Sequence, residues 1–239
     1  KNMIPLESVM SKVWNNKIFK NIQEKVDDIS KILAEEKGPC PDAAEYGFNE
    51  RFSNKTAIAP TASISIICGG ASPGVEPIAA NSYTHKTLSG SYNVRNRYLE
   101  KILEKHNKNN EEIWSSITTS QGSVLHLDFL TDLEKKVFKT AFELDQKWIV
   151  ELGADRTPYI SQAQSINIFL PADVHKKELH QIHFQAWKKG LKSLYYCRSK
   201  SIQRAENVNG KLSTDTTKNV YSQNTLDEET DDNECLSCQ

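Results

Sequence analysis

Apolar residues recur at intervals of three and four along several stretches of the chain, a pattern typical of amphipathic helices. The clearest stretch, Lys17–Lys37, predicts a helix that ends at Gly38, where prolines follow. Tyr92–His106 predicts a second helix. A third is expected to begin with the capping box Thr131–Glu134 and to continue to a stop at Gly153. The expected buried face of the first helix consists of Ile18, Ile22, Val26, Ile29 and Leu33.

Two later stretches carry strand patterns. Apolar residues alternate along Ser165–Leu170, which predicts a strand, and Leu191–Cys197 is a second short and mostly apolar run. Between them, Pro171 and Asp173 are expected to end the strand and cap a helix that stops at Gly190. A strand, a helix and a strand with short connections predict a crossover unit. The fold class is therefore α/β, with a parallel sheet or barrel.

The stretch Thr56–Pro77 predicts a short apolar run, a turn at Pro60 and a brief helix that two glycines stop. The first N–H groups of a helix lack intrahelical partners and favour negative charge, so this turn is a candidate anion site. The alternative is an N-capped core helix with a buried apolar side. The pattern is not that of a P-loop, because no lysine lies in the turn. The hydroxyl residues are Thr61, Ser63 and Ser65, and the apolar ones are Ile64, Ile66 and Ile67.

The composition changes after about Lys200. Apolar residues become rare, and from Asn219 to the end there is no Lys or Arg, while acidic residues gather there. Such a segment buries too little apolar surface to offset the entropy lost on ordering. We therefore expect one main domain over residues 1–205 and a disordered acidic tail over residues 206–239.

The composition also argues against several classes of protein. With a formal net charge of -1, the 239 residues have no basic excess for general nucleic-acid binding. No apolar run is long enough to predict a membrane span, and no signal peptide is evident. Five cysteines, an odd number, favour a reducing cytoplasm over a secreted disulfide framework. The first residue, Lys1, is not Met, so we expect a piece of a larger protein.

The last residues contain two thiols, Cys235 and Cys238, at C-x-x-C spacing. Such a pair can supply half a zinc site, for which His180 and His183 are the available partners. It can also be a pair of stray exposed thiols. A flexible arm of about thirty residues spans roughly 30 Å, which favours a dithiol carrier that reaches a distant site and exchanges electrons there.

Tyr195 and Tyr196 are adjacent at the end of a predicted strand. Tyrosines in strands most often fill a core, and neighbouring strand residues point to opposite faces. The functional alternative is that the two phenols pass a radical, because each O–H can be oxidised and then restored. The residues alone leave both interpretations open.

Taken together, these features resemble the C-terminal part of the large subunit of class I ribonucleotide reductase. The resemblance rests on the segments PTASISIICGGASPGVEP, NSYTHKTLSG, QSINIFL and IHFQAWKKGLKS, on YYC and on the terminal CLSC. It runs in one register from about Asn54 to about Arg198 and reappears in the last residues. It implies an α/β fold that forms the C-terminal portion of a ten-stranded reductase barrel.

The resemblance also implies which residues act. Tyr195 and Tyr196 correspond to radical-relay tyrosines, and Cys235 and Cys238 correspond to shuttle cysteines that thioredoxin or glutaredoxin recharges. Ile64 stands where a hydroxyl residue is common in the family's phosphate loop, so only its backbone N–H can serve there. The phosphate loop as a whole corresponds to Pro60, Thr61, Ala62, Ser63 and Ile64.

The implied reaction is reduction of a ribonucleoside diphosphate by a cysteine thiyl radical. In the family, that cysteine, its Asn and Glu partners, the reducing cysteines and the ATP and dNTP effector sites lie upstream of the phosphate loop. The remaining cysteines here, Cys40, Cys68 and Cys197, are expected to be packed thiols. This chain is therefore expected to be inactive alone.

The implied partners are the N-terminal part of the large subunit and a small subunit that carries the metal-radical cofactor. No cofactor or metal is expected on this chain itself, and neither nucleic acid nor membrane is an expected partner. Two rival functions stay open. One is a non-catalytic interaction module, and the other is an unrelated nucleotide-phosphate-binding α/β domain.

Overall fold

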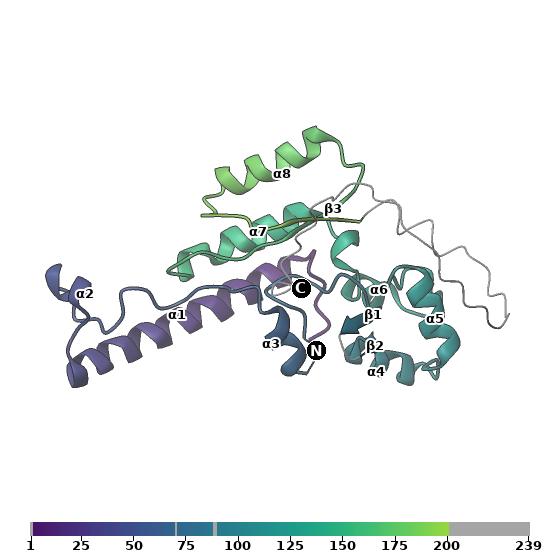
Figure 1. Ribbon diagram of the computed structural model, residues 1–239, viewed down its shortest axis with the longest axis horizontal. Coiled ribbons are helices and arrows are strands. Elements are labelled where there is room, and N and C mark those ends of the chain that lie inside the picture. The colour runs from purple at the N-terminus through teal and green to yellow at the C-terminus, as the bar shows by residue number, and fades with distance from the viewer. Residues whose placement is uncertain (1, 70, 88–89, 201–239) are drawn as a thin grey trace, which may run out of the picture.

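The computed structural model describes residues 2–69, 71–87 and 90–200 (Figure 1). The predicted tail, residues 206–239, lies outside the described residues. The helices are α1 (Val9–Lys37), α2 (Pro41–Glu45), α3 (Ala62–Ile67), α4 (Arg97–Lys105), α5 (Glu111–Thr119), α6 (Asp132–Val137), α7 (Gln146–Arg156) and α8 (Lys176–Lys188), with short 3-10 turns η1 (Ala141–Glu143) and η2 (Thr157–Tyr159). The strands are β1 (Ser82–Thr87), β2 (Gly90–Arg95), β3 (Ile168–Pro171) and β4 (Cys197–Lys200). In the described part of the chain, no helix has both the length and the apolar character that crossing a bilayer requires.

The predicted crossover unit is confirmed. Strands β3 and β4 pair in parallel, with Ile168 opposite Cys197, and α8 connects them. The second strand was misplaced, because β4 begins at Cys197, where the predicted strand ended. The predicted cap was also wrong: the ring Nδ1 of His175, not Asp173, accepts the first free N–H of α8, from Lys177 at 3.1 Å. The helix ends just before Gly190, as predicted.

The helix predicted from Thr131 to Gly153 is broken into α6, η1 and α7. The capping box is present, since Thr131 and Glu134 satisfy each other's backbone N–H groups. The helix stops at Val137 because new local caps follow: the carboxylate of Glu143 accepts the N–H of Thr140 at 2.8 Å, and Asp145 caps α7. Gly153 is not a helix stop but lies within α7. A Cβ there would approach Ile166 Cδ1 to 2.7 Å, so glycine permits close packing at this position.

The helix predicted over Tyr92–His106 begins later than expected. Residues up to Arg95 form β2, which pairs antiparallel with β1, and Asn96 then caps α4 by accepting the N–H of Tyr98 at 3.0 Å. The hairpin and α4 to α6 form one end of the molecule around a first hydrophobic cluster (Figure 1). A second cluster joins α7, β3 and α8, and its buried members are Leu144, Ile149, Val150, Ile166, Ile168, Leu170, Ile182 and Ala186.

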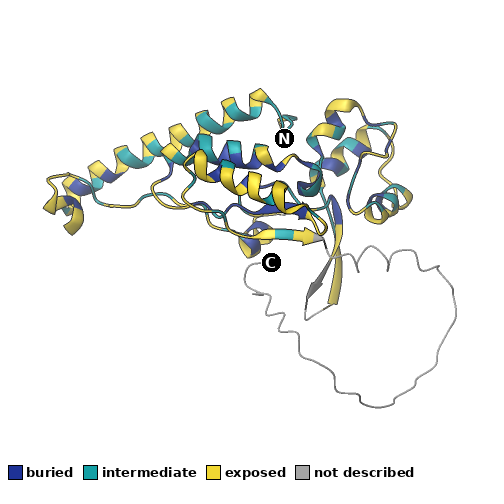
Figure 2. Ribbon diagram, turned by 90° about the horizontal axis from the view of Figure 1, so that it is seen from above, coloured by how far each residue is buried: buried dark blue, intermediate teal, exposed yellow. Residues whose placement is uncertain are grey.

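Helix α1 begins eight residues before the predicted helix and packs against α7. The amide of Asn15 donates to the carbonyl of Leu152 at 2.9 Å, and Ser30 and Ala34 are the buried residues of α1. The predicted buried face was wrong in part, because Ile18, Ile22 and Ile29 are exposed. Much of the long helix α1 is coloured as exposed or intermediate in Figure 2. The three isoleucines are part of an exposed apolar stripe, because residues at this spacing lie on one side of a helix. The stripe consists of Trp14, Ile18, Ile22, Ile29 and Ile32.

Candidate functional site

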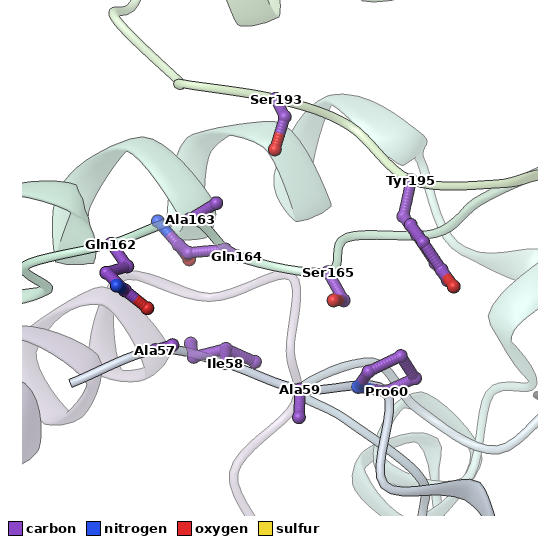
Figure 3. Close-up of a pocket in the computed structure, with 10 residues that line it drawn as sticks. All are labelled: Ala57, Ile58, Ala59, Pro60, Gln162, Ala163, Gln164, Ser165, Ser193 and Tyr195. Carbon is purple, nitrogen blue, oxygen red and sulfur yellow. The ribbon is translucent and has the colours of Figure 1, made fainter.

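Three segments of the chain line an open cavity of about 650 Å³ (Figure 3). The first segment precedes α3, the second precedes β3, and the third precedes β4. The first two run side by side, because Ile58 and Gln164 form a parallel bridge. Pro60 of the predicted phosphate loop and Tyr195 of the predicted tyrosine pair both line this cavity. The full lining is Ala57, Ile58, Ala59, Pro60, Gln162, Ala163, Gln164, Ser165, Ser193 and Tyr195.

The turn into α3 is held by Thr61, which has left-handed backbone angles (φ 54°, ψ 28°). Threonine is a β-branched residue and rarely adopts this conformation, so the surrounding structure must stabilise it. Its hydroxyl does not cap α3 but accepts the N–H of Gly74 at 2.7 Å. Of the other loop residues, Ala62 is buried, whereas Ser63 and Ile64 are exposed.

The interpretation of α3 as an N-capped core helix is wrong. No side chain caps it, and its isoleucines face outward, with Ile67 83% exposed. Ser65 is buried and donates to the carbonyl of Ala62 at 2.7 Å, so this hydroxyl is already used within the helix. The glycine after Cys68 has φ 91° and ends the helix as predicted. The outward face of α3 is therefore available for contacts beyond this segment.

Tyr195 and Tyr196 form a contacting pair just before β4. Their ring centroids are 4.2 Å apart at an interplanar angle of 56°, and the rings are 43% and 40% exposed. The interpretation of the pair as core residues is therefore wrong. Their backbone is fixed beside β3, since the N–H of Tyr195 donates to Ile166 at 2.8 Å and Ile168 donates to Tyr196 at 2.9 Å. The guanidinium of Arg198 lies 5.6 Å from the centroid of the Tyr196 ring.

Charged residues are buried beneath the cavity. Burial lowers the pKa of Arg156 to about 10, against the opposing effect of the charges on Glu76 and Asp155. Its Nε donates to Gln164 at 2.6 Å. Burial likewise raises the pKa of Glu76, against the opposing effects of backbone N–H groups and Arg156. Gln164 also lines the cavity, so its hydrogen bond with Arg156 links the cavity wall to this buried guanidinium.

The cysteines differ in part from the predictions. Cys68 and Cys197 are exposed rather than packed, and only Cys40 is half-buried. Cys235 and Cys238 lie outside the described residues. His180 stacks on Phe184 in α8. Over the described ranges, no three His, Cys, Asp or Glu side chains form a cluster that could hold a metal ion.

Comparison with known proteins identifies the family. The family model described as "Ribonucleotide reductase, barrel domain" matches residues 42–197, which include the phosphate-loop segment, β3 and the tyrosine pair. The chain belongs to this reductase barrel family. The second rival interpretation, an unrelated nucleotide-phosphate-binding α/β domain, is thereby excluded.

Relatives in the reductase family share substantial identity with this chain. The ribonucleoside-diphosphate reductase large subunits of Invertebrate iridescent viruses 6 and 3 are 47% and 40% identical over 209 and 240 residues, which cover 86% and 99% of this chain. The class Id ribonucleotide reductase alpha subunit of Actinobacillus ureae superimposes with a TM-score of 0.77 at 40% identity, over 86% of this chain. The chain spans only 22%, 36% and 37% of those three proteins.

Sequence reasoning missed the buried polar groups of this reductase barrel site. Glu76, Asn167 and Arg156 are each at most 9% exposed, yet none was singled out. Glu76 is the one carboxylate within the otherwise small and apolar stretch Thr56–Pro77, and Asn167 interrupts the apolar run just before β3. A charged residue in such surroundings is the signal that could have identified it.

Proposed function

We propose that this chain is the C-terminal part of the catalytic barrel of a ribonucleoside-diphosphate reductase. It acts in the reduction of ribonucleotides to deoxyribonucleotides by radical chemistry, together with the remaining part of the large subunit. One observation carries the proposal: Pro60 and Tyr195 line a single cavity in a chain of the reductase barrel family. Substrate phosphate and the radical path then meet in one place.

Each predicted site residue has a role in this proposal. Residues Pro60 to Ile64 bind the phosphates of a ribonucleoside diphosphate through the free backbone N–H groups at the start of α3 and through the hydroxyls of Thr61 and Ser63. The Thr61 hydroxyl accepts the N–H of Gly74 and still has its own hydrogen to donate. Tyr195 and Tyr196 carry oxidation from the metal-radical cofactor of a small subunit. Cys235 and Cys238 re-reduce the active-site disulfide and are recharged by thioredoxin or glutaredoxin.

The remaining partners and the location follow from the same proposal. The rest of the large subunit supplies the thiyl cysteine, the reducing cysteines and the sites for ATP and dNTP effectors. The metal stays with the small subunit, and this chain binds no cofactor of its own. The reaction takes place in the cytoplasm, where thioredoxin and glutaredoxin keep thiols reduced.

Complementation tests the proposed function. This chain is mixed with the preceding part of a matching large subunit, a small subunit and dithiothreitol, and reduction of CDP is measured. We expect turnover in the complete mixture and none when any one protein is omitted. A well-folded, co-purifying mixture without turnover would favour the rival function of a non-catalytic interaction module.

The exposed apolar stripe of α1 is the surface that we propose for the remaining large subunit. All of its side chains are exposed in the described part of the chain, and an exposed apolar stripe along a helix is typical of a surface that another part of a larger structure covers. The relatives are several times longer than this chain, so they hold the residues that can cover it. We therefore propose that the rest of the reductase barrel covers this stripe.

Ile22→Glu is expected to weaken this association by about 10-fold or more, because a carboxylate at a covered apolar position must lose its water. Binding of the preceding large-subunit part is measured by calorimetry. Lys31→Glu is the matched control, since Lys31 is exposed on α1 but lies outside the stripe. Equal affinities for the Ile22→Glu protein and the parent would contradict this assignment.

A further inference from the structure

Glu76 is a buried carboxylate between the phosphate loop and the tyrosine pair. Its side chain is 4% exposed, although it belongs to a loop rather than to a helix or strand. A buried carboxylate lowers the stability of the fold unless its oxygens accept hydrogen bonds. The Glu76 carboxylate contacts two segments of the chain. One contains the proposed phosphate loop, and the other lies beside the tyrosine pair.

The first contact is on the side of the phosphate loop. The carboxylate lies against Gly74, where an added Cβ would come within 2.8 Å of Glu76 Oε2. Gly74 has φ 62° and donates its N–H to the hydroxyl of Thr61. Since Thr61 has left-handed backbone angles, it needs such a fixed partner. Glu76 thus packs directly against the residue whose N–H fixes Thr61.

The second contact is on the side of the tyrosines. The N–H of Asn167 donates to Glu76 Oε1 at 2.5 Å. The side-chain oxygen of Asn167 accepts the N–H of Tyr196 at 3.3 Å, and the next residue, Ile168, donates to the Tyr196 carbonyl at 2.9 Å. The backbone N–H and C=O of Tyr196 are therefore held by Asn167, whose own N–H donates to Glu76, and by the next residue, Ile168.

We propose that Glu76 is a positioning residue that sets the phosphate loop and the tyrosine pair in one fixed relation. This inference rests on the proposed function, because it concerns the reaction of that same site. Substrate bound at Thr61 and a radical arriving through Tyr196 must meet at a constant distance. A displacement of about 1 Å at a reacting centre can cost on the order of 100-fold in rate.

The ionisation of Glu76 separates this role from simple stabilisation. Burial raises its pKa above the usual 4.5, and the charged group that faces it is Arg156, which lowers it less. A carboxyl whose pKa is higher in the folded state favours folding only while it is protonated. That contribution is lost as the pH rises from about 4.5 through the folded-state pKa. Above the folded-state pKa the buried charge costs stability, so a role other than stabilising the fold is needed to account for a carboxylate at this position.

The test uses Glu76→Gln in the assembled reductase. Glutamine has the same shape without the charge, but its NH₂ group must face at least one of the N–H groups of Val75, Glu76 and Asn167 that stabilise the carboxylate. We expect the melting temperature at pH 7 to be maintained. We expect the dissociation constant for CDP to rise about 10-fold and turnover at saturating CDP to fall by about 10- to 100-fold.

Glu134→Gln is the matched control. Glu134 is 6% exposed and also accepts backbone hydrogen bonds, from Thr131 at 2.9 Å, but it lies in the capping box of α6. This variant is expected to show the opposite result: a lower melting temperature, with CDP affinity and turnover per folded molecule unchanged. Glu76→Ala should lose both stability and function, because it also leaves a cavity.

Amide hydrogen exchange provides a readout that does not depend on turnover. In Glu76→Gln, peptides that contain Gly74, Asn167 or Tyr196 should exchange faster, while peptides of α4 and α5 should not change. Unchanged exchange, or CDP affinity and turnover equal to the parent, would overturn the proposal. A parent assembly that exchanges as expected but neither binds nor reduces CDP would instead refute the proposed function.

Discussion

Tyr195→Phe and Tyr196→Phe are each expected to lower turnover of the assembled reductase at least about 100-fold. Phenylalanine preserves the ring contact, in which the centroids lie 4.2 Å apart, but has no O–H to oxidise. The affinity for CDP should stay unchanged, because the proposed phosphate contacts come from Pro60 to Ile64, at the start of α3, and not from the phenol groups. Turnover and CDP binding are measured on the same preparations.

Tyr92→Phe provides the control for these substitutions. Tyr92 is an exposed tyrosine of β2 and does not line the cavity. Its loss should leave both turnover and CDP affinity as in the parent. Normal turnover in either the Tyr195→Phe or the Tyr196→Phe protein would remove that tyrosine from the radical path and would return the pair to a structural role.

Gly122→Ala is expected to have the largest effect on folding, a loss of about 3 kcal/mol or more in the free energy of unfolding. Gly122 has φ 82°, and a Cβ there would lie 2.5 Å from the backbone Cα of Ala80. The same glycine accepts both the backbone N–H and the side-chain amide of buried Asn81, at 3.1 and 2.9 Å. Because backbone meets backbone at this point, no side-chain rotation can relieve the contact.

Urea unfolding of Gly122→Ala is best compared with that of Gly190→Ala. Gly190 has a similar φ of 78°, but a Cβ there would meet nothing within 4 Å. Only the backbone strain remains, which costs about 1 kcal/mol. Equal losses for the two variants would show that the close approach of Ala80 to Gly122 is not a fixed feature of the fold.

Local hydrogen bonding explains which elements could be predicted. The crossover from β3 through α8 to β4 and the capping box at Thr131 follow from short-range patterns, and both are present. The hairpin β1–β2 was missed because its residues are mostly polar on both faces and so carry no alternation. The break before α7 was missed because apolar spacing continues across residues whose caps interrupt the helix.

The apolar period of α1 could be recognised from the sequence, but the side of the helix that is buried could not. A period shows that apolar residues share a side of a helix, and it does not show what covers that side. Asn15 contacts Leu152 of α7, and Ser30 accepts the N–H of Arg51 farther along the helix, so polar and small residues determine which side of α1 is buried. Sequence reasoning assigned the larger residues to that packing, whereas Ile18 and Ile22 face outward.

The candidate site was predicted through resemblance rather than through local pattern. Thr61 is expected to donate its hydroxyl hydrogen to phosphate, and no pattern in the sequence indicated that the same hydroxyl also accepts the N–H of Gly74, thirteen residues away. Contacts between residues about 90 positions apart, such as Glu76 with Asn167, leave no spacing signal in a single sequence. The roles of the tyrosines and terminal cysteines stay predictions until the assays above are made.

The cavity is lined mainly by small side chains and backbone, with Ala57, Ala59 and Ser165 among them. Such a wall suits the diphosphate and the sugar, which every ribonucleotide shares, and it offers little that could tell a purine from a pyrimidine. In the proposed reductase, the cavity wall that this chain contributes then does not select among the bases. Under the proposed function, selection among the four bases falls to residues outside those described here, so that selection can change while this wall stays the same.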